Sequence, residues 1–214
     1  RTILSVPGLQ KILLFTPGDA AIGAKIVELV DLVAFTGSIN AGKKIALAAS
    51  KKLTPVLMEI GAKDPAIVMQ GANLEIAATD ILKGSTTNAG QNCLSFERIY
   101  VHESIHDTLV DLLVEKTKAL QLVTEDQHKG EIGPIIFEKQ VLTINTHLED
   151  AKTLGAIMLT GSNSCEQIHG GFYCRPTILV NVTHNMLLMK EETFGPIMPI
   201  MSFSSTEEVV ELAN

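Results

Sequence analysis

Short apolar runs alternate along this chain with longer stretches in which apolar residues recur at helical spacing. A short run bounded by Gly, Pro or Ser predicts a buried strand, and spacing of three or four residues predicts an amphipathic helix. The alternation predicts βαβ units and a doubly wound α/β fold with a largely parallel sheet. The expected strands are 11–15, 32–36, 55–60, 65–69 and 98–102, with short strands near 157, 178 and 200. The expected helices are 20–29, 38–50, 74–87, 105–120 and 138–154.

Composition agrees with one large domain or two small ones. The 214 residues are 46% apolar but only 4% aromatic, without Trp, so burial must come from aliphatic residues and Met, as is common in buried parallel sheets. A boundary is expected near Thr54 and Pro55, which divides the chain into residues 1–54 and 55–214.

Charge and cysteine usage exclude several classes of partner. The net charge of −7 is spread without a basic stripe, so neither nucleic acid nor an anionic membrane surface is expected as a partner, and no apolar run is long enough to span a membrane. Three irregularly spaced cysteines do not indicate a disulfide framework, which favours a reducing, cytoplasmic location. Cys165, His169 and Cys174 match no common zinc spacing, so we expect no metal site and a glycine-rich surface loop there.

Residues 88–93, Asn-Ala-Gly-Gln-Asn-Cys, form a polar loop of small residues between an expected helix and strand. Such a loop can present a reactive group, and Cys93 is expected to be an accessible thiol. A nucleophilic cysteine needs both exposure and help in reaching the thiolate. The alternative is a structural cysteine that is buried as a small apolar residue.

Two further segments carry candidate chemistry. Glu59 lies inside an apolar run just before a glycine, where partial desolvation would raise its pKa toward the range of a general base. The alternative is a strand-end acid that pairs with Lys63 or faces water. Gly37 and Ser38 follow an apolar strand and open a helix, a geometry that offers backbone N–H groups to a phosphate, although Ser38 could equally be only a helix cap.

These three segments, together with residues 190–196 (Lys-Glu-Glu-Thr-Phe-Gly-Pro), resemble the aldehyde dehydrogenase superfamily. Family members carry F-T-G-S, E-L-G-G-K, G-Q-x-C and E-E-x-F-G-P in this order and at similar intervals, and the resemblance covers essentially the whole chain. It implies an aldehyde-dehydrogenase-like α/β fold. Residues 1–54 would be the end of a Rossmann-like NAD(P)-binding domain, and residues 55–214 would belong to a catalytic domain with a parallel open sheet.

The resemblance also implies a reaction, the oxidation of an aldehyde to a carboxylic acid with NAD or NADP. Cys93 would form a thiohemiacetal that passes hydride to the nicotinamide and becomes a thioester, and Glu59 would activate the hydrolytic water. The backbone N–H of Cys93 would stabilise the oxyanion, with an asparagine that lies upstream of this sequence. The implied cofactor contacts are Gly37 and Ser38 on the pyrophosphate, Glu192 on the nicotinamide ribose and Phe194 beside it.

Family subunits are longer than this chain, so the resemblance implies a central piece that would be inactive by itself, from a protein that forms a homodimer or homotetramer. Two alternatives stay open. A coenzyme A-acylating dehydrogenase would be indifferent to Glu59→Gln, but such relatives usually lack this acid, so hydrolysis is favoured. A non-catalytic family-like domain would show an ordinary thiol at Cys93 and no nucleotide affinity.

Overall fold

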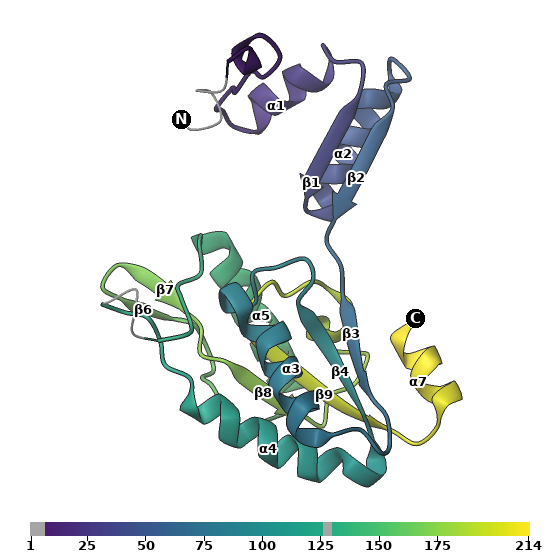
Figure 1. The fold of residues 1–214 in the computed structure, drawn as a ribbon, viewed down its shortest axis with the longest axis vertical. Helices are drawn as coiled ribbons and strands as arrows, with labels where there is room; N and C mark the ends of the chain where they lie inside the picture. The colour runs from purple at the N-terminus through teal and green to yellow at the C-terminus, as the bar shows by residue number, and fades with distance from the viewer. Residues whose placement is uncertain (1–6, 126–129) are drawn as a thin grey trace. The chain divides into compact units, whose positions relative to one another are not determined.

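The computed structural model describes residues 7–125 and 130–214, and the chain divides into two compact units, Arg1–Gly61 and Ala62–Asn214 (Figure 1). The division follows Gly61 rather than Thr54, because the strand after Thr54 pairs with a strand of the first unit. The two units are described separately below.

The described residues of the first unit form two parallel strands and two α-helices. Its elements are the 3-10 helix η2 (Leu9–Lys11), α1 (Ala20–Val27), β1 (Val33–Gly37), α2 (Ile39–Ser50) and β2 (Val56–Ile60). The register of the parallel pair places Val33 beside Val56 and Gly37 beside Ile60. Asp19 and Ser38 accept hydrogen bonds from the first free N–H groups of α1 and α2, so the sequence itself fixes where both helices begin.

The strand expected at residues 11–15 is wrong. Lys11 ends η2, and the apolar run after it is not part of a sheet, with Ile12 82%, Leu14 88% and Phe15 79% exposed. No strand among the described residues pairs with this run. An apolar pattern alone does not make a strand, because the backbone N–H and C=O groups also need partners.

The second unit is built on a five-stranded sheet with the order β3-β4-β9-β8-β5. Its strands are β3 (Asp64–Val68), β4 (Phe96–His102), β5 (Ile157–Met158), β8 (Thr177–Val180) and β9 (Ile197–Phe203). β3, β4, β9 and β8 run parallel, and β5 lies antiparallel at the edge. The sequence therefore predicted the α/β class and the mostly parallel sheet correctly.

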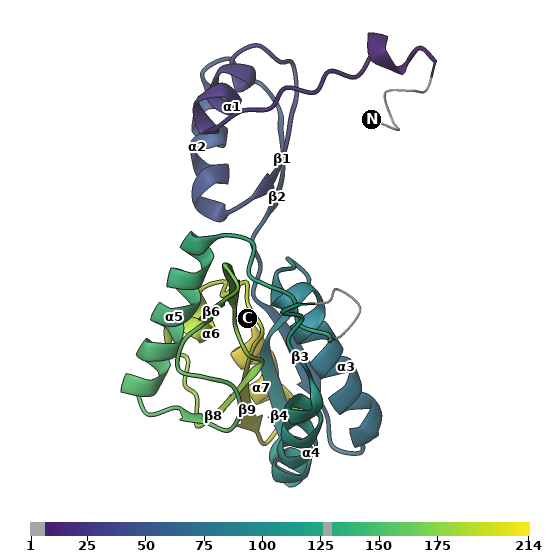
Figure 2. The same ribbon diagram turned by 90° about the vertical axis from the view of Figure 1, so that its left-hand side faces the viewer.

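Helices cover both faces of this sheet, with α3 and α4 on one side and α5 on the other (Figure 2). The helical elements are α3 (Leu74–Thr86), η3 (Thr87–Gly90), η4 (Glu103–Ile105), α4 (His106–Ala119), α5 (Glu138–Thr153), α6 (Leu187–Lys190) and α7 (Thr206–Ala213). Strand β9 shows how the core is divided. Met198 and Ile200 pack into the cluster that contains residues of α3 and α4, whereas Ile197 and Phe203 pack with α5 and α6, as the two-residue period of a strand requires.

A short hairpin, β6 (Glu166–Ile168) and β7 (Gly171–Tyr173), occupies the segment that the sequence suggested was a surface loop. The hairpin brings Cys165 and Cys174 together, and the two form a disulfide with their Cα atoms 4.2 Å apart. This corrects the expectation that the cysteines are unpaired, and it removes the basis for inferring a reducing compartment from them. Irregular spacing along the chain says little about cysteines that a β-hairpin makes neighbours.

Candidate active site

Cys93 lies in a loop between α3 and β4, defined here as residues 87–95 and called the cysteine loop. It is the free cysteine of the chain, and its side chain is exposed. The exposure confirms an accessible thiol and excludes the buried structural alternative. The loop is anchored behind Cys93, where the buried Ser95 hydroxyl donates to the carbonyl of Gly84 at 3.1 Å.

The backbone ahead of Cys93 has an unusual conformation. Asn88, Ala89 and Gly90 have φ values of 55°, 56° and 70°, all in the left-handed region that non-glycine residues seldom adopt. The buried Gln91 side chain holds this turn. Its Nε2 donates to the carbonyls of Asn88 at 2.9 Å and Pro134 at 3.1 Å, and its Oε1 accepts from the backbone N–H of Ile136 at 2.8 Å. Three satisfied polar contacts therefore fix the backbone immediately before the thiol.

The cysteine loop packs directly against a second loop, residues 191–196, called the 191–196 loop. A Cβ placed on Gly90 would overlap the carbonyl group of Gly195 and lie 2.7 Å from the nitrogen of Pro196. A Cβ on Gly195 would in turn lie 2.6 Å from Cδ1 of Ile144 on α5. Two glycines thus allow the G-Q-x-C and F-G-P segments to touch backbone to backbone.

The 191–196 loop carries Glu192 and Phe194, and both side chains are partly buried. Phe194 has a left-handed φ of 50°. Burial raises the pKa of Glu192, and the negative charge of Glu97 raises it further, while the Ala62 backbone N–H and the Lys63 charge act in the opposite direction. Glu192 is therefore a carboxylate with partial access to solvent and a pKa above its ordinary value.

A cluster of buried polar side chains lies beneath this loop, formed by Lys63, Glu97, His147 and Thr193. Lys63 makes an ion pair with Glu97, and only 11% and 4% of the two side chains are exposed. The Thr193 hydroxyl lies 3.2 Å from Lys63 Nζ and 3.1 Å from His147 Nδ1. Burial lowers the pKa of Lys63 and of His147, so the cluster suits a neutral imidazole beside one ion pair.

Glu59 lies near the end of β2 in the first unit, and its side chain is exposed. The expectation of partial desolvation is therefore wrong for this chain, because β2 forms one edge of a two-stranded sheet. The alternative ion pair with Lys63 is also not found, since Lys63 binds Glu97 instead.

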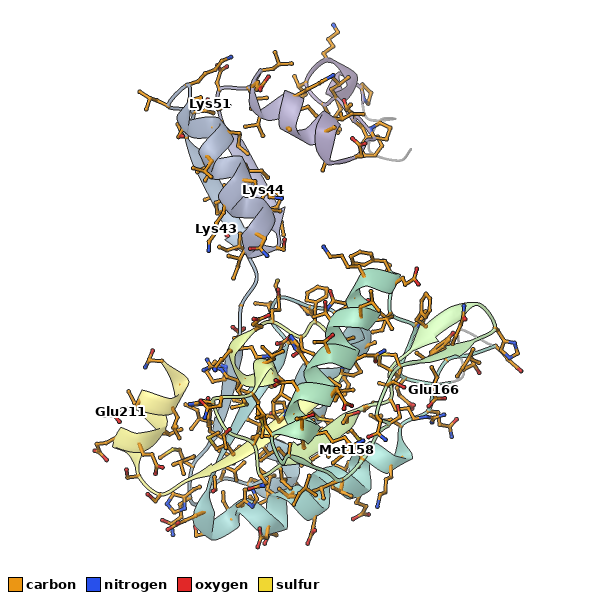
Figure 3. The ribbon with its side chains drawn as sticks, turned by 180° about the vertical axis from the view of Figure 1, so that it is seen from behind. Lys43, Lys44, Lys51, Met158, Glu166 and Glu211 are labelled. Atoms are coloured by element: carbon orange, nitrogen blue, oxygen red, sulfur yellow. A yellow bond between two sulfur atoms is a disulfide. The ribbon has the colours of Figure 1, made fainter. Side chains whose placement is uncertain are left out.

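Gly37 ends β1 and Ser38 caps α2, with the Ser38 hydroxyl accepting from the N–H of Ala41 at 3.3 Å. Both residues are exposed, and among the described residues no acceptor faces the N–H groups of Ile39 and Asn40. Free N–H groups at a helix start suit a phosphate, and a partly exposed carboxylate such as Glu192 suits hydroxyl groups, so each unit separately has groups of a kind that a nucleotide needs. Figure 3 shows Lys43 and Lys44 on α2 and Lys51 directly after the last residue of that helix.

The second unit thus brings together Cys93, Glu192 and Phe194 on two touching loops, while Gly37, Ser38 and Glu59 belong to the first unit. Sequence reasoning missed Gln91 as the support of the cysteine loop and Glu97 as the partner of Lys63. For Glu97, the sequence signal was its own charge, placed beside Phe96 at the start of an otherwise largely apolar strand. Within the described ranges, no three His, Cys, Asp or Glu side chains gather as a metal site.

No helix of the described residues is long and apolar enough to cross a lipid bilayer. Comparison with protein families matches residues 8–214 to the family described as the aldehyde dehydrogenase family. Succinate-semialdehyde dehydrogenase (NADP(+)) 1 of Schizosaccharomyces pombe is 35% identical over 199 residues, which are 93% of this chain and 40% of that protein. The chloroplastic betaine aldehyde dehydrogenase of Atriplex hortensis is 37% identical over 210 residues, 97% of this chain and 41% of that protein.

Solved structures agree with the sequence comparison. PutA from Anabaena variabilis, whose assignment as an aldehyde dehydrogenase is provisional, is 47% identical with a TM-score of 0.96 and covers 99% of this chain and 45% of its own. The NAD+ complex of an aldehyde dehydrogenase from Bacillus cereus is 36% identical with a TM-score of 0.88, over 94% of this chain and 41% of its own. This chain spans about two fifths of the length of the curated relatives that it matches.

Proposed function

This chain belongs to the aldehyde dehydrogenase family, and from that premise we propose that its protein oxidises an aldehyde to a carboxylic acid with NAD or NADP through a covalent bond to Cys93. The observation that supports this most is the exposed Cys93 thiol in a loop that Gln91 and Ser95 hold on either side. A thiol so placed can meet a substrate without first reorganising its backbone.

Cys93 begins the proposed reaction by attacking the carbonyl carbon. The thiol would lose its proton to solvent water, to which it is exposed, as the new S–C bond forms and the carbonyl π electrons move to oxygen, giving the oxyanion of a thiohemiacetal. The Cys93 backbone N–H, which has no acceptor among the described residues, would donate to that oxyanion. A bound nicotinamide would supply the hydride acceptor. The oxyanion would re-form the C=O bond as the same carbon loses hydride, so that Cys93 would carry a thioester.

Glu59 completes the proposed reaction as a general base. Its carboxylate would take a proton from water while the water oxygen attacks the thioester carbon, and the S–C bond would break to release the carboxylic acid and the Cys93 thiolate. The exposed side chain at the end of β2 leaves this carboxylate open to solvent water.

The proposed cofactor contacts are the four that the family resemblance implies. Gly37 and Ser38 would bind the pyrophosphate through the free N–H groups at the start of α2. Glu192 would accept hydrogen bonds from the nicotinamide ribose, and Phe194 would pack beside it. Residues 1–61 would then be the NAD(P)-binding part and residues 62–214 the part that carries the nucleophile.

The test is the rate of Cys93 alkylation by iodoacetamide against pH, in the full-length protein, with and without NAD. Because Cys165 and Cys174 are paired, non-reducing conditions leave Cys93 as the reactive thiol of this region. We expect an apparent pKa below the reference of roughly 8.5, a rate that changes with NAD, and no reaction in Cys93→Ser. A slow reaction with an unperturbed pKa and no response to NAD would contradict the proposal.

A second measurement separates hydrolysis from acyl transfer to coenzyme A. Glu59→Gln should give a burst of NADH followed by slow turnover, on the order of 10²-fold below wild type, because the thioester forms but no base activates water. Turnover that requires coenzyme A and ignores Glu59→Gln would instead favour the acylating alternative.

A further inference from the structure

Glu97 is a buried carboxylate with three donors around it. It lies in β4, and only 3% of the residue is exposed. Its Oε1 accepts from the backbone N–H of Phe194 at 2.7 Å, and its Oε2 accepts from that of Thr193 at 2.8 Å and from the Lys63 ammonium. A single side chain thus holds two consecutive peptide groups of the 191–196 loop.

The segment that Glu97 holds has no regular structure of its own. Residues 191–196 lie between the end of α6 and the start of β9, and the backbone is left-handed at Phe194. Thr193 is held at three further points, since Gln140 Nε2 donates to its carbonyl at 2.6 Å and Lys63 and His147 contact its hydroxyl. Side chains therefore define a position that no β-ladder or helix could define.

Stability alone does not account for an ion pair in this place. Removing two charges from water is costly, and a buried pair can often be replaced by apolar residues of similar volume without loss of stability. Two charges retained under a loop that carries Glu192 and Phe194 suggest a requirement for geometry. A carboxylate that bridges neighbouring N–H groups restricts the loop backbone more tightly than apolar packing does.

We propose that Glu97, neutralised by Lys63, is a positioning residue that fixes the Thr193–Phe194 backbone and so directs Glu192 and Phe194 toward the nicotinamide ribose of NAD(P). The inference rests on the proposed function, because it assigns the ribose contact to Glu192. Glu97 itself is enclosed beneath the loop and acts through it.

The charges of the pair reach Glu192 as well. Three charged groups act on this carboxylate, namely Glu97 in β4, Asp64 at the start of β3 and Lys63 immediately before that strand. Glu97 and Asp64 raise the pKa of Glu192, and Lys63 lowers it. The two members of the pair therefore act on Glu192 in opposite directions.

The first test measures NAD affinity of the full-length protein by titration calorimetry for wild type, Glu97→Gln and Glu166→Gln. The amide at position 97 would place an NH2 group against a backbone N–H or the Lys63 ammonium, so the loop should loosen and the Kd for NAD should rise about tenfold. Cys93 alkylation without NAD should stay within about twofold of wild type. Glu166→Gln is the matched control and should leave both values unchanged, because Glu166 at the start of β6 (Figure 3) pairs with Arg175, outside both loops.

The second test measures NAD affinity against pH. A general weakening of the fold would not shift the pH midpoint of NAD binding in opposite directions in two variants. NAD affinity should fall on acidification as Glu192 takes up a proton. Glu97→Gln should shift the midpoint of that loss to lower pH, and Lys63→Met should shift it to higher pH. Equal midpoints in all three proteins, or shifts in the same direction, would overturn the inference.

The third test separates positioning from folding. Lys63→Met/Glu97→Leu replaces the pair with apolar side chains, and we expect it to fold even if Glu97→Gln does not, with a Kd for NAD still raised about tenfold. Wild-type NAD affinity in this double variant would show that the pair is only structural, which overturns the inference while the proposed function stands. A wild-type protein that binds no NAD would overturn both.

Discussion

The cysteine loop and the 191–196 loop touch, yet different kinds of contact hold them. The cysteine loop is fixed by the neutral amide of Gln91, and its tip is exposed at Cys93. The 191–196 loop is fixed from below by the buried charges of Glu97 and Lys63. The neutral support acts through hydrogen bonds, whereas the charged support also changes the pKa of the neighbouring Glu192 carboxylate. One site can therefore position its nucleophile with one set of contacts and set the pKa of its carboxylate with another.

The largest effect should come from Gly90→Ala, which attacks the point where the loops meet. The new methyl group would overlap the Gly195 carbonyl, and the left-handed φ of 70° adds strain, so we expect a loss of about 3 kcal/mol or more in the free energy of unfolding. Urea denaturation measures it. Gly133→Ala is the control, since nothing lies within 4 Å of its Cβ position, and equal losses in the two variants would contradict the predicted clash.

Gln91→Leu and Gln140→Leu should then distinguish the two loops. Gln91→Leu leaves the N–H of Ile136 and the carbonyl of Pro134 without partners, for a loss of about 2–3 kcal/mol, and should change the alkylation rate of Cys93. Gln140→Leu removes one bond to Thr193, for about 1 kcal/mol, and should change NAD affinity instead. Thiol reactivity that responds equally to both variants would show that the loops are not independent.

Reduction of the Cys165–Cys174 disulfide should have a smaller effect than Gly90→Ala. The hairpin it closes bonds to that loop's support, because the N–H of Ile135 donates to the carbonyl of Phe172 at 2.6 Å. Dithiothreitol should lower the stability by about 2 kcal/mol through loop-closure entropy. Thermal unfolding of wild type and of Cys165→Ser/Cys174→Ser, each with and without reductant, measures it. A response to reductant in the double variant would point to another cause.

The smallest effect is the pH dependence that His147 contributes beneath the 191–196 loop. Burial and the Lys63 charge lower the pKa of His147 below the ordinary 6.5, so the unfolded chain binds more protons than the folded one in that range. Stability should therefore fall as pH drops below about 6.5 toward the folded pKa, and His147→Gln should reduce the slope of urea midpoints against pH. His184, whose pKa burial also lowers, contributes a slope of the same sign. An unchanged slope in His147→Gln would contradict the assignment.

Much of the fold could be predicted because its elements carry local signals. Asn73 caps α3 through a bond from the N–H of Ile76, and such caps mark helix starts in the sequence itself. The β6–β7 hairpin could not be predicted, because Gly170 and Gly171 suggest a loop until the pairing of Gln167 with Phe172 is known. The strand predicted at residues 11–15 was wrong for the opposite reason. The local pattern favoured a strand, but a strand also needs a pairing partner, and the local pattern does not reveal whether there is one.

The residues of the candidate site also differ in whether the sequence alone could predict them. Cys93 and Glu192 stand in contiguous motifs, so a single sequence could mark both as candidates. Glu97 depends on long-range register, since it meets Thr193 only because β4 runs beside β9, whose first residue follows the 191–196 loop. The burial of Glu59 was misjudged because an apolar run does not reveal whether a second layer covers its strand.

The left-handed turn before Cys93 limits what evolution or a mutant library can change there. β-Branched residues are nearly excluded where φ is positive, as at Asn88, Ala89 and Gly90, so few substitutions should survive at these positions. Leu94, which is 71% exposed, carries no such restriction. In a saturation library, changes in substrate preference should therefore come chiefly from the exposed side chains beside the thiol. The backbone turn at residues 88–90 should stay almost unchanged.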